Sequence, residues 1–349
     1  MNLQLKKFKA INLSDPFFDT LKSDYQEFDV WFAKKSEDWA YVFESGNGSI
    51  EGFLYLKTEN GVVQDTAPPL PPAHRIKVGT LKINAHGTKL GERFLKKIFD
   101  HAITENVEEI YLTVFEKHAP LVALLKKYGF EVRGSKSTPN GTELVLLKVL
   151  HGDYKNPDLS YPLINASGPN IYLLSVYPDW HTRLLPDSIL NNESATIVQD
   201  VSHTNSIHKI YLAAMAGLDS LKSGDILIIY RTSDGDGPAH YRSVATSVCV
   251  VEGYQNINNF SSEKDFLDYC MPYSVFTEAE LKGFWAKKKY PHIIRFTYNV
   301  ALKKRITRGE LIEEIELDSR AYWGFMPVTK DQFLNIVKKS EINESLIVN

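Results

Sequence analysis

Residues 82–95 read KINAHGTKLGERFL, an extended apolar stretch that runs into a helix through a turn with glycines at positions 87 and 91. The first backbone amides of a helix have no partner within the helix, and glycines leave the preceding turn bare. Such a corner suits an anion, most often a phosphate. The stretch therefore predicts a strand, a turn and a helix, with an anion site where the helix begins.

The residues of this helix, expected from about Gly91 to Thr104, have two distinct faces. Apolar residues recur at helical spacing and predict the buried face: Leu90, Phe94, Leu95, Ile98, Phe99 and Ala102. Basic residues gather in the N-terminal half: Lys89, Arg93, Lys96 and Lys97. Cations at that end oppose the helix dipole, so they indicate either a negative partner or a solvated face. Periodicity alone leaves both interpretations open.

The bulk composition is that of a globular protein with two domains. At 349 residues the chain exceeds the size at which one core stops growing. A net charge of -3 gives no whole-chain argument for nucleic acid, and two cysteines cannot form a disulfide framework or a zinc site alone. The sequence contains no apolar run long enough to span a membrane and no signal-peptide core near Met1, so we expect a cytoplasmic protein without membrane contact.

The order of elements predicts an α/β (α+β) protein. A Gly-, Pro- and Asn-rich segment at 151–170 indicates a linker between domains at 1–150 and 171–349. The first domain reads as a β-meander followed by β-α-β-α-β-β, a mixed sheet with helices on both faces. Within it, a hairpin is expected around the glycines at 46–48, and a proline-rich, exposed loop at 58–75.

Strands dominate the second half, which predicts a compact β-barrel with peripheral helices. Short helices are expected at 203–218, 263–270, 277–287 and 329–339.

Two motifs in the first domain resemble those of the GNAT family of acyl-CoA-dependent N-acetyltransferases, over roughly residues 1–150. HGTKLG at 86–91 is similar to the family's pyrophosphate loop, with a histidine in the Arg/Gln place and a lysine replacing the first glycine. LLKKYGF at 124–130 is similar to the family's leucine-rich helix followed by Gly-Phe.

The resemblance implies that acetyl-CoA, or a related acyl-CoA, binds at the opening stretch. Backbone groups of Ile83 and Ala85 would pair with the pantetheine arm, and amides from Gly87 to Glu92 would hold the pyrophosphate. The implied cofactor-binding residues are Ile83, Ala85, His86, Gly87, Thr88, Lys89, Leu90, Gly91 and Glu92.

Catalytic residues are less clearly marked. The family often has a tyrosine four residues before the Gly-Phe pair, and Leu125 stands there. The nearest titratable candidates are His118 and Tyr128, each of which also has a structural interpretation, as a helix cap and as a packing residue. Positioning of an amine against a polarised thioester can supply much of the catalysis without them. A leucine at position 125 is also consistent with a domain that has no catalytic activity.

Three stretches of the second half resemble PUA-like domains of the ASCH and EVE groups, over roughly 170–340. They are VYPDWHTRLLPD at 176–187, SLKSGDILIIYRT at 220–232 and RSVATSVCVVEGY at 242–254. Such domains usually bind RNA or modified bases, so the resemblance implies cations and stacking rings. The expected nucleic-acid-binding residues are Trp180, His181, Tyr230, Lys287, Lys288, Lys289, Tyr322 and Trp323. Since residues 151–349 carry 20 basic and 24 acidic side chains, a solvated basic face and core aromatics remain the alternative.

No metal site is expected, because the ten histidines form neither HExxH nor a Cys-His cluster. The leading hypothesis is an acetyl-CoA-dependent N-acetyltransferase whose second domain presents RNA, such as a tRNA carrying an amino acid, or a modified nucleoside. A protein lysine acetyltransferase is the enzymatic alternative. A non-catalytic protein that senses acyl-CoA and binds RNA or a modified base is the alternative from another class. The sequence leaves the oligomeric state open.

Overall fold

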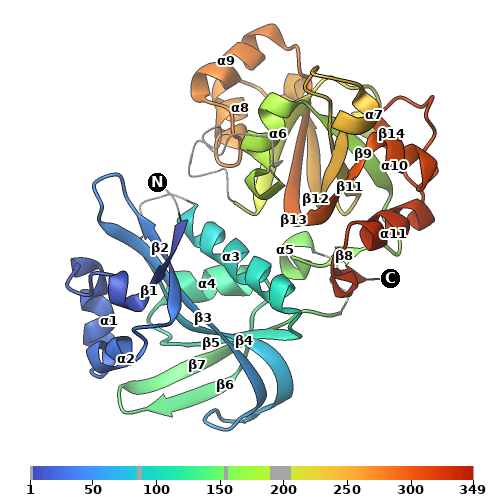
Figure 1. The fold of residues 1–349 in the computed structure, drawn as a ribbon. Helices are drawn as coiled ribbons and strands as arrows, with labels where there is room; N and C mark the ends of the chain where they lie inside the picture. The colour runs from blue at the N-terminus through green and yellow to red at the C-terminus, as the bar shows by residue number, and fades with distance from the viewer. Residues whose placement is uncertain (1–2, 85–88, 153–155, 189–205, 349) are drawn as a thin grey trace. The chain divides into compact units, whose positions relative to one another are not determined.

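The chain divides into two compact units, Met1–Leu150 and His151–Asn349. The structure is a computed structural model that describes residues 3–84, 89–152, 156–188 and 206–348 (Figure 1). Both units combine a mixed sheet with helices, so the expected α/β class is confirmed. None of the helices in the described part of the chain is long and apolar enough to cross a membrane.

The first unit contains seven strands and four α-helices in its described residues. The strands are β1 (Leu3–Lys7), β2 (Trp39–Glu44), β3 (Ile50–Val63), β4 (Leu70–Ile83), β5 (Glu109–Val114), β6 (Glu131–Thr138) and β7 (Gly141–Val149). The helices are α1 (Asp19–Asp24), α2 (Phe28–Lys34), α3 (Leu90–Glu105) and α4 (Ala119–Lys127). The strands form one sheet in the order β1-β2-β3-β4-β5-β7-β6.

Helices cover both faces of this sheet, as the sequence predicts (Figure 1). Neighbouring residues on a strand point to opposite faces. Phe53 on β3 packs with Phe28 and Phe32 of α2 in one core cluster. Gly52, beside it, faces α3 so closely that a Cβ there would lie 2.3 Å from the Phe94 ring. Thus α2 and α3 lie on opposite sides of β3.

Strands β4 and β5 are the parallel pair of the first sheet, and they separate partway along their length. Their pairing runs from Arg75↔Glu109 to Val78↔Leu112, while β4 continues to Ile83. Gly79, the next residue of β4, is an extra residue in the ladder to β3, which shifts register between Tyr55 and Leu56. A bulge bends and twists its strand, so β4 turns away from β5 here. A Cβ on Gly79 would lie 2.6 Å from the Tyr55 ring, which explains the glycine.

The opposite end of this parallel pair is held by a buried arginine. The side chain of Arg75 is fully buried, and its guanidinium forms an ion pair of 3.1 Å with Glu109 of β5. The same guanidinium donates to the carbonyl oxygens of Gly61 and Pro71. One side chain therefore links β3, β4 and β5 where the strands remain paired.

The expected loop at 58–75 is wrong for most of its length. Strands β3 and β4 form a long hairpin that pairs as far as Val63↔Leu70. Pairing with β5 begins only at Arg75, so Pro71 and Pro72 lie where β4 has a strand on one side, and proline is tolerated at such an edge.

Lys148 on β7 gives a stability prediction. Burial lowers the pKa of its ammonium from 10.5 to about 7, and its Nζ lies 5.7 Å from the centre of the Phe99 ring. Between these two values the unfolded chain binds more protons than the folded one, so this group makes stability rise with pH. We expect Lys148→Met to remove that rise between about pH 7 and pH 10, measured by urea unfolding; an unchanged slope would contradict the assignment.

The second unit has eight strands and seven α-helices in its described residues. The strands are β8 (Ile164–Asn165), β9 (Ile171–Val176), β10 (His208–Ala213), β11 (Ile226–Arg231), β12 (Val244–Asn256), β13 (His292–Thr307), β14 (Phe325–Pro327) and β15 (Ile347–Val348). The helices are α5 (Pro157–Ser160), α6 (Pro178–Leu184), α7 (Ala239–Arg242), α8 (Glu263–Cys270), α9 (Glu278–Lys287), α10 (Arg308–Glu313) and α11 (Lys330–Lys339).

Six of these strands form a sheet in the order β10-β13-β12-β11-β9-β14. Within the described ranges no pairing joins the end strands β10 and β14, so the sheet of the expected compact β-barrel is not closed. Its edges are protected in other ways. Ile210 of β10 bridges to Ser274, and β14 is only three residues long and ends at Pro327.

Helices α8, α9 and α11 confirm three of the expected helices, and the fourth, at 203–218, is wrong. Residues 208–213 form β10, which pairs with β13, and all six are buried. A short, continuous apolar run cannot be assigned to helix or strand by periodicity alone. The expected linker at 151–170 also contains α5 and β8, and β8 pairs with β15. These residues therefore belong to the second unit.

Candidate functional site

A cavity of about 980 Å³ lies in the first unit, at the gap between β4 and β5. It is lined on the strands by Gly79–Ile83 of β4 and by Leu112, Thr113 and Val114 of β5. Gly91 of α3 and Trp31 of α2 also line it. Because α2 and α3 lie on opposite sides of the sheet, the cavity passes through the sheet where the two strands separate. It can therefore admit two reactants from opposite faces.

The opening of α3 forms one end of this cavity. Lys89 occupies the N-cap position without a side-chain cap on the helix amides, and α3 then runs for 16 residues. A Cβ on Gly91 would lie 2.8 Å from Cδ2 of Leu124, so glycine allows α4 to pack close to this turn. The predicted cofactor residues Ile83, Lys89, Leu90, Gly91 and Glu92 all line the cavity. The others, Ala85, His86, Gly87 and Thr88, lie outside the described residues.

The remaining basic residues of α3 do not line this cavity. Arg93 lies over the Phe43 ring at 4.9 Å, and Lys97 lies over the Tyr41 ring at 5.5 Å. Lys96 forms an ion pair of 2.9 Å with Asp100. Among the four basic residues in the N-terminal half of this helix, Lys89 is the one in the cavity lining.

The two predicted catalytic residues are in very different environments. His118 lines the cavity, and its Nε2 lies 2.9 Å from Oδ2 of Asp24. Tyr128 is fully buried at the end of α4, with its ring 6.5 Å from that of Phe99, and the cavity lining does not include it. Tyr128 is therefore a packing residue, while His118 keeps its candidate role.

A tyrosine–glutamate pair in the lining of the cavity was missed by the sequence analysis. The Tyr25 hydroxyl donates to Oε1 of Glu143 at 2.5 Å, and both residues line the cavity. Glu143 is only 3% exposed. Burial, together with the bond to Glu143, raises the pKa of the Tyr25 phenol, so the phenol keeps its proton. The pair joins α1 to β7 across 118 positions, a separation at which no local motif could indicate it.

In the second unit, three of the predicted nucleic-acid-binding residues are buried. His181 is fully buried and bonds to Oγ1 of Thr246 at 2.8 Å, and burial lowers its pKa to about 3. Tyr230 and Trp323 pack against each other with ring centres 5.2 Å apart. All three side chains are therefore buried in the second unit, and every residue of β11, which carries Tyr230, is buried as well.

The other predicted residues differ in exposure. Tyr322 is 59% exposed, and Lys287 and Lys289 are exposed at the end of α9. Trp180 is partly buried against Phe276, with ring centres 4.8 Å apart. Lys288 lies over the Trp285 ring.

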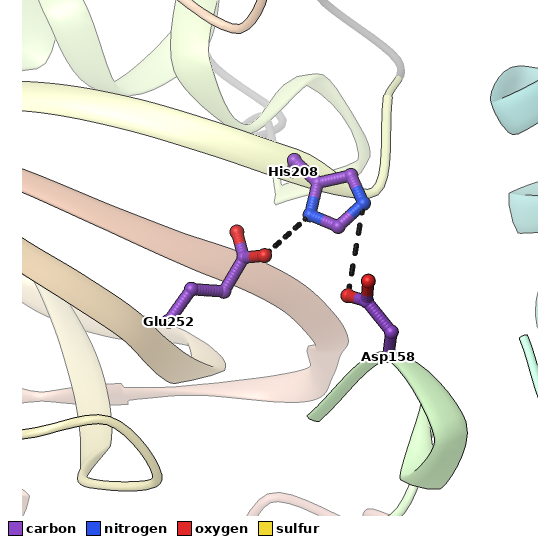
Figure 2. A group of neighbouring side chains, drawn as sticks. All are labelled: Asp158, His208 and Glu252. Carbon is purple, nitrogen blue, oxygen red and sulfur yellow. Dashed lines mark hydrogen bonds and ion pairs between the residues drawn. The ribbon is translucent and has the colours of Figure 1, made fainter. Parts of the chain in front are cut away.

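A group of three side chains in the second unit has ligand types that metal ions accept (Figure 2). Candidate ligand atoms of Asp158, His208 and Glu252 lie within 4.8 Å of one another. The carboxylates face opposite ring nitrogens of His208: Glu252 lies 2.9 Å from Nδ1 and Asp158 3.9 Å from Nε2. Burial would raise the pKa of Glu252, but His208 and Arg295 outweigh it and hold the pKa below its usual value. Arg295 lies 3.1 Å from Glu252, so this carboxylate already has a cationic partner, and Asp158 brings α5 close to His208 on β10.

Comparisons with known proteins find similarity only among solved structures. No protein-family model matches the sequence, and no curated protein matches it. Naa20 from Chaetomium thermophilum, in complex with a bisubstrate analogue, has 16% identity and a TM-score of 0.34 over 43% of this chain and 86% of its own. The NatC complex bound to Gag peptide and CoA has 16% identity and a TM-score of 0.30 over 43% and 99%. A serine-to-alanine mutant of ZmASCH from Zymomonas mobilis has 9% identity and a TM-score of 0.31 over 49% and 96%.

Proposed function

We propose that the first unit is an acyl-CoA-dependent N-acyltransferase that transfers an acetyl group from acetyl-CoA to an amine. The observation that supports this best is the cavity that passes through the sheet between β4 and β5, with the opening turn of α3 at one end. Acetyl-CoA would supply the thioester, and the amine would approach from the side of α1 and α2.

The residues present fit such a donor at each of its parts. From Gly79 to Ile83 the edge of β4 that faces away from β3 has no strand paired to it in the described residues, so its peptide groups can bind a pantetheine arm as a strand would. The amides of Leu90, Gly91 and Glu92 open α3 and favour an anion such as a diphosphate.

Positioning would supply most of the catalysis, because both reactants are held in one cavity. His118 lines that cavity and is oriented by Asp24, so it is placed to return a proton to the leaving thiolate. Leu125 is fully buried and contributes packing only.

Release of CoA from acetyl-CoA in the presence of a mixture of primary amines, followed with a thiol reagent, tests this function. We expect amine-dependent release of the free thiol and an acetylated amine in the mass spectrum. Binding of acetyl-CoA without transfer would favour the non-catalytic, acyl-CoA-sensing alternative. Transfer to lysine side chains of a protein but not to small or RNA-linked amines would favour the lysine acetyltransferase.

We further propose that the second unit binds RNA, or an amine carried on RNA. Support comes from exposed rings that could stack on bases: Tyr177 at 63%, Tyr241 at 70% and Tyr322 at 59% exposure. The parallel strands β9 and β11 end side by side at Val176 and Arg231. Tyr177 and the residues leading to α7 therefore lie at the same end of these strands. Fluorescence anisotropy with a labelled tRNA should show binding that weakens as salt rises. No change in anisotropy at low salt would contradict this proposal.

A further inference from the structure

The Tyr25–Glu143 pair occupies a defined position relative to the gap between β4 and β5. Strand β5 pairs with β7 through Val114↔Leu144, so Glu143 stands one residue beyond the end of β5. The Tyr25 ring stacks on Phe115, the residue that follows β5, with ring centres 5.3 Å apart. Both partners are therefore anchored at the end of β5, whose last residues line the cavity.

On the side of α1 and α2 the cavity lining carries both carboxylates and ammonium groups, the latter from Lys35 and Lys82. Asp24 and Glu27 flank Tyr25 in the sequence, and both line the cavity. Asp24 also holds Lys117 at 2.5 Å, and Glu27 accepts a hydrogen bond from Asn140 at 2.8 Å. The cation nearest in the strand ladder is Lys136, the cross-strand partner of Glu143, and its Nζ is engaged by Asp65 at 2.6 Å.

We propose that Glu143 is the catalytic base of this site, that Tyr25 is its positioning residue, and that the acceptor is an amine that arrives as an ammonium ion. The inference rests on the proposed acyl transfer. Alkyl amines carry a proton at neutral pH, since a lysine-type ammonium has a pKa of about 10.4. Such an acceptor is attracted by carboxylates and must lose a proton before its nitrogen can attack.

The transfer requires only the ammonium, the thioester, Glu143, His118 and water. The ammonium passes one proton to the Glu143 carboxylate, and the freed nitrogen pair forms the C–N bond to the thioester carbonyl. The C–S bond then breaks, its electron pair leaves on sulfur, and the thiolate takes the second nitrogen proton through His118. Glu143 then returns its proton to water. The Tyr25 hydroxyl, which keeps its proton, donates to Oε1 and so fixes the orientation of the Glu143 carboxylate.

Two amines of nearly equal shape test the assignment: ethylamine, which is protonated at neutral pH, and 2,2,2-trifluoroethylamine, which is largely neutral. We expect Glu143→Gln to lower turnover of ethylamine about 100-fold and to leave turnover of trifluoroethylamine and the affinity for acetyl-CoA unchanged. The glutamine amide oxygen in this variant can still accept the Tyr25 hydrogen bond, so the fold is preserved. Tyr25→Phe should lower ethylamine turnover less, by about tenfold, and alter the pH profile of kcat rather than KM.

Glu44→Gln is the control, because Glu44 is a carboxylate of the same unit that pairs with Lys6 at 2.7 Å, and neither of these residues lines the cavity. Its turnover of both amines should equal that of the wild type. If Glu143→Gln lowered the turnover of both amines equally, or of neither, the role of Glu143 would be overturned and the proposed function would stand. Acetylation of trifluoroethylamine but not of ethylamine by the wild type would overturn the ammonium acceptor and leave the proposed acyl transfer intact, whereas binding of acetyl-CoA with neither amine acetylated would favour the non-catalytic alternative. Absence of acetyl-CoA binding would instead refute the proposed function itself.

Discussion

Gly91→Asp is expected to lower the affinity of the protein for acetyl-CoA about 100-fold, measured by titration calorimetry. The substitution places a carboxylate in the first turn of α3, where the diphosphate would lie, and like charges brought together cost several kcal/mol. A Cβ at this position would also lie 2.8 Å from Leu124, so part of the effect could come from bulk.

Gly91→Asn separates charge from bulk, since the amide has the shape of the carboxylate without its charge. We expect Gly91→Asn to bind acetyl-CoA markedly more tightly than Gly91→Asp, with the difference shrinking as salt screens the repulsion. Equal affinity in the two variants would show that packing against Leu124, rather than charge, governs this position. If Gly91→Asp bound acetyl-CoA as tightly as the wild type does, the placement of the diphosphate at the start of α3 would be contradicted.

Arg75→Met is expected to destabilise the first unit by about 3–5 kcal/mol, measured as the free energy of unfolding in urea. The arginine side chain is fully buried, and its loss would leave the Glu109 carboxylate, 13% exposed, without its guanidinium partner. The carbonyl oxygens of Gly61 and Pro71 would lose a donor as well. Because this residue clamps the paired end of β4 and β5, the loss should also weaken acetyl-CoA binding at the separated end.

Arg133→Met provides the matched control. Arg133 lies on β6 in the same unit, and its ion pair with Glu131 has side chains 49% and 58% exposed. A surface pair of this kind contributes about 0–1 kcal/mol, so its loss should barely change stability. A similar loss of unfolding free energy in the two variants would mean that burial does not determine how much Arg75 stabilises the first unit.

The elements that the sequence predicted well are those with strong local signals. The helix after the opening stretch was expected from about Gly91, and α3 begins at Leu90, because the apolar spacing of its buried face is regular. The leucine-rich helix before the Gly-Phe pair is α4, which has Tyr128 as its C-cap and is followed by Gly129 with a φ of 80°, a conformation that favours glycine.

What the sequence could not predict depends on distant contacts. Tyr25 and Glu143 meet across 118 positions, and Asp158, His208 and Glu252 come from α5, β10 and β12. No local motif indicated the separation of β4 from β5, because its cause, the bulge at Gly79, depends on the ladder to β3. His181 and Tyr230, expected from the PUA-like resemblance to bind nucleic acid, proved to be buried, because aromatic and histidine side chains occur in cores as well as in pockets.

The central claim is that the gap between β4 and β5 holds the arm of an acyl-CoA, with its diphosphate at the opening of α3. A crystal structure of the protein grown with CoA measures this most directly. We expect the pantetheine chain to lie alongside Gly79–Ile83 and phosphate oxygens to lie within hydrogen-bonding distance of the amides of Gly91 and Glu92. CoA bound elsewhere, or a side chain filling the gap while CoA is present, would contradict it.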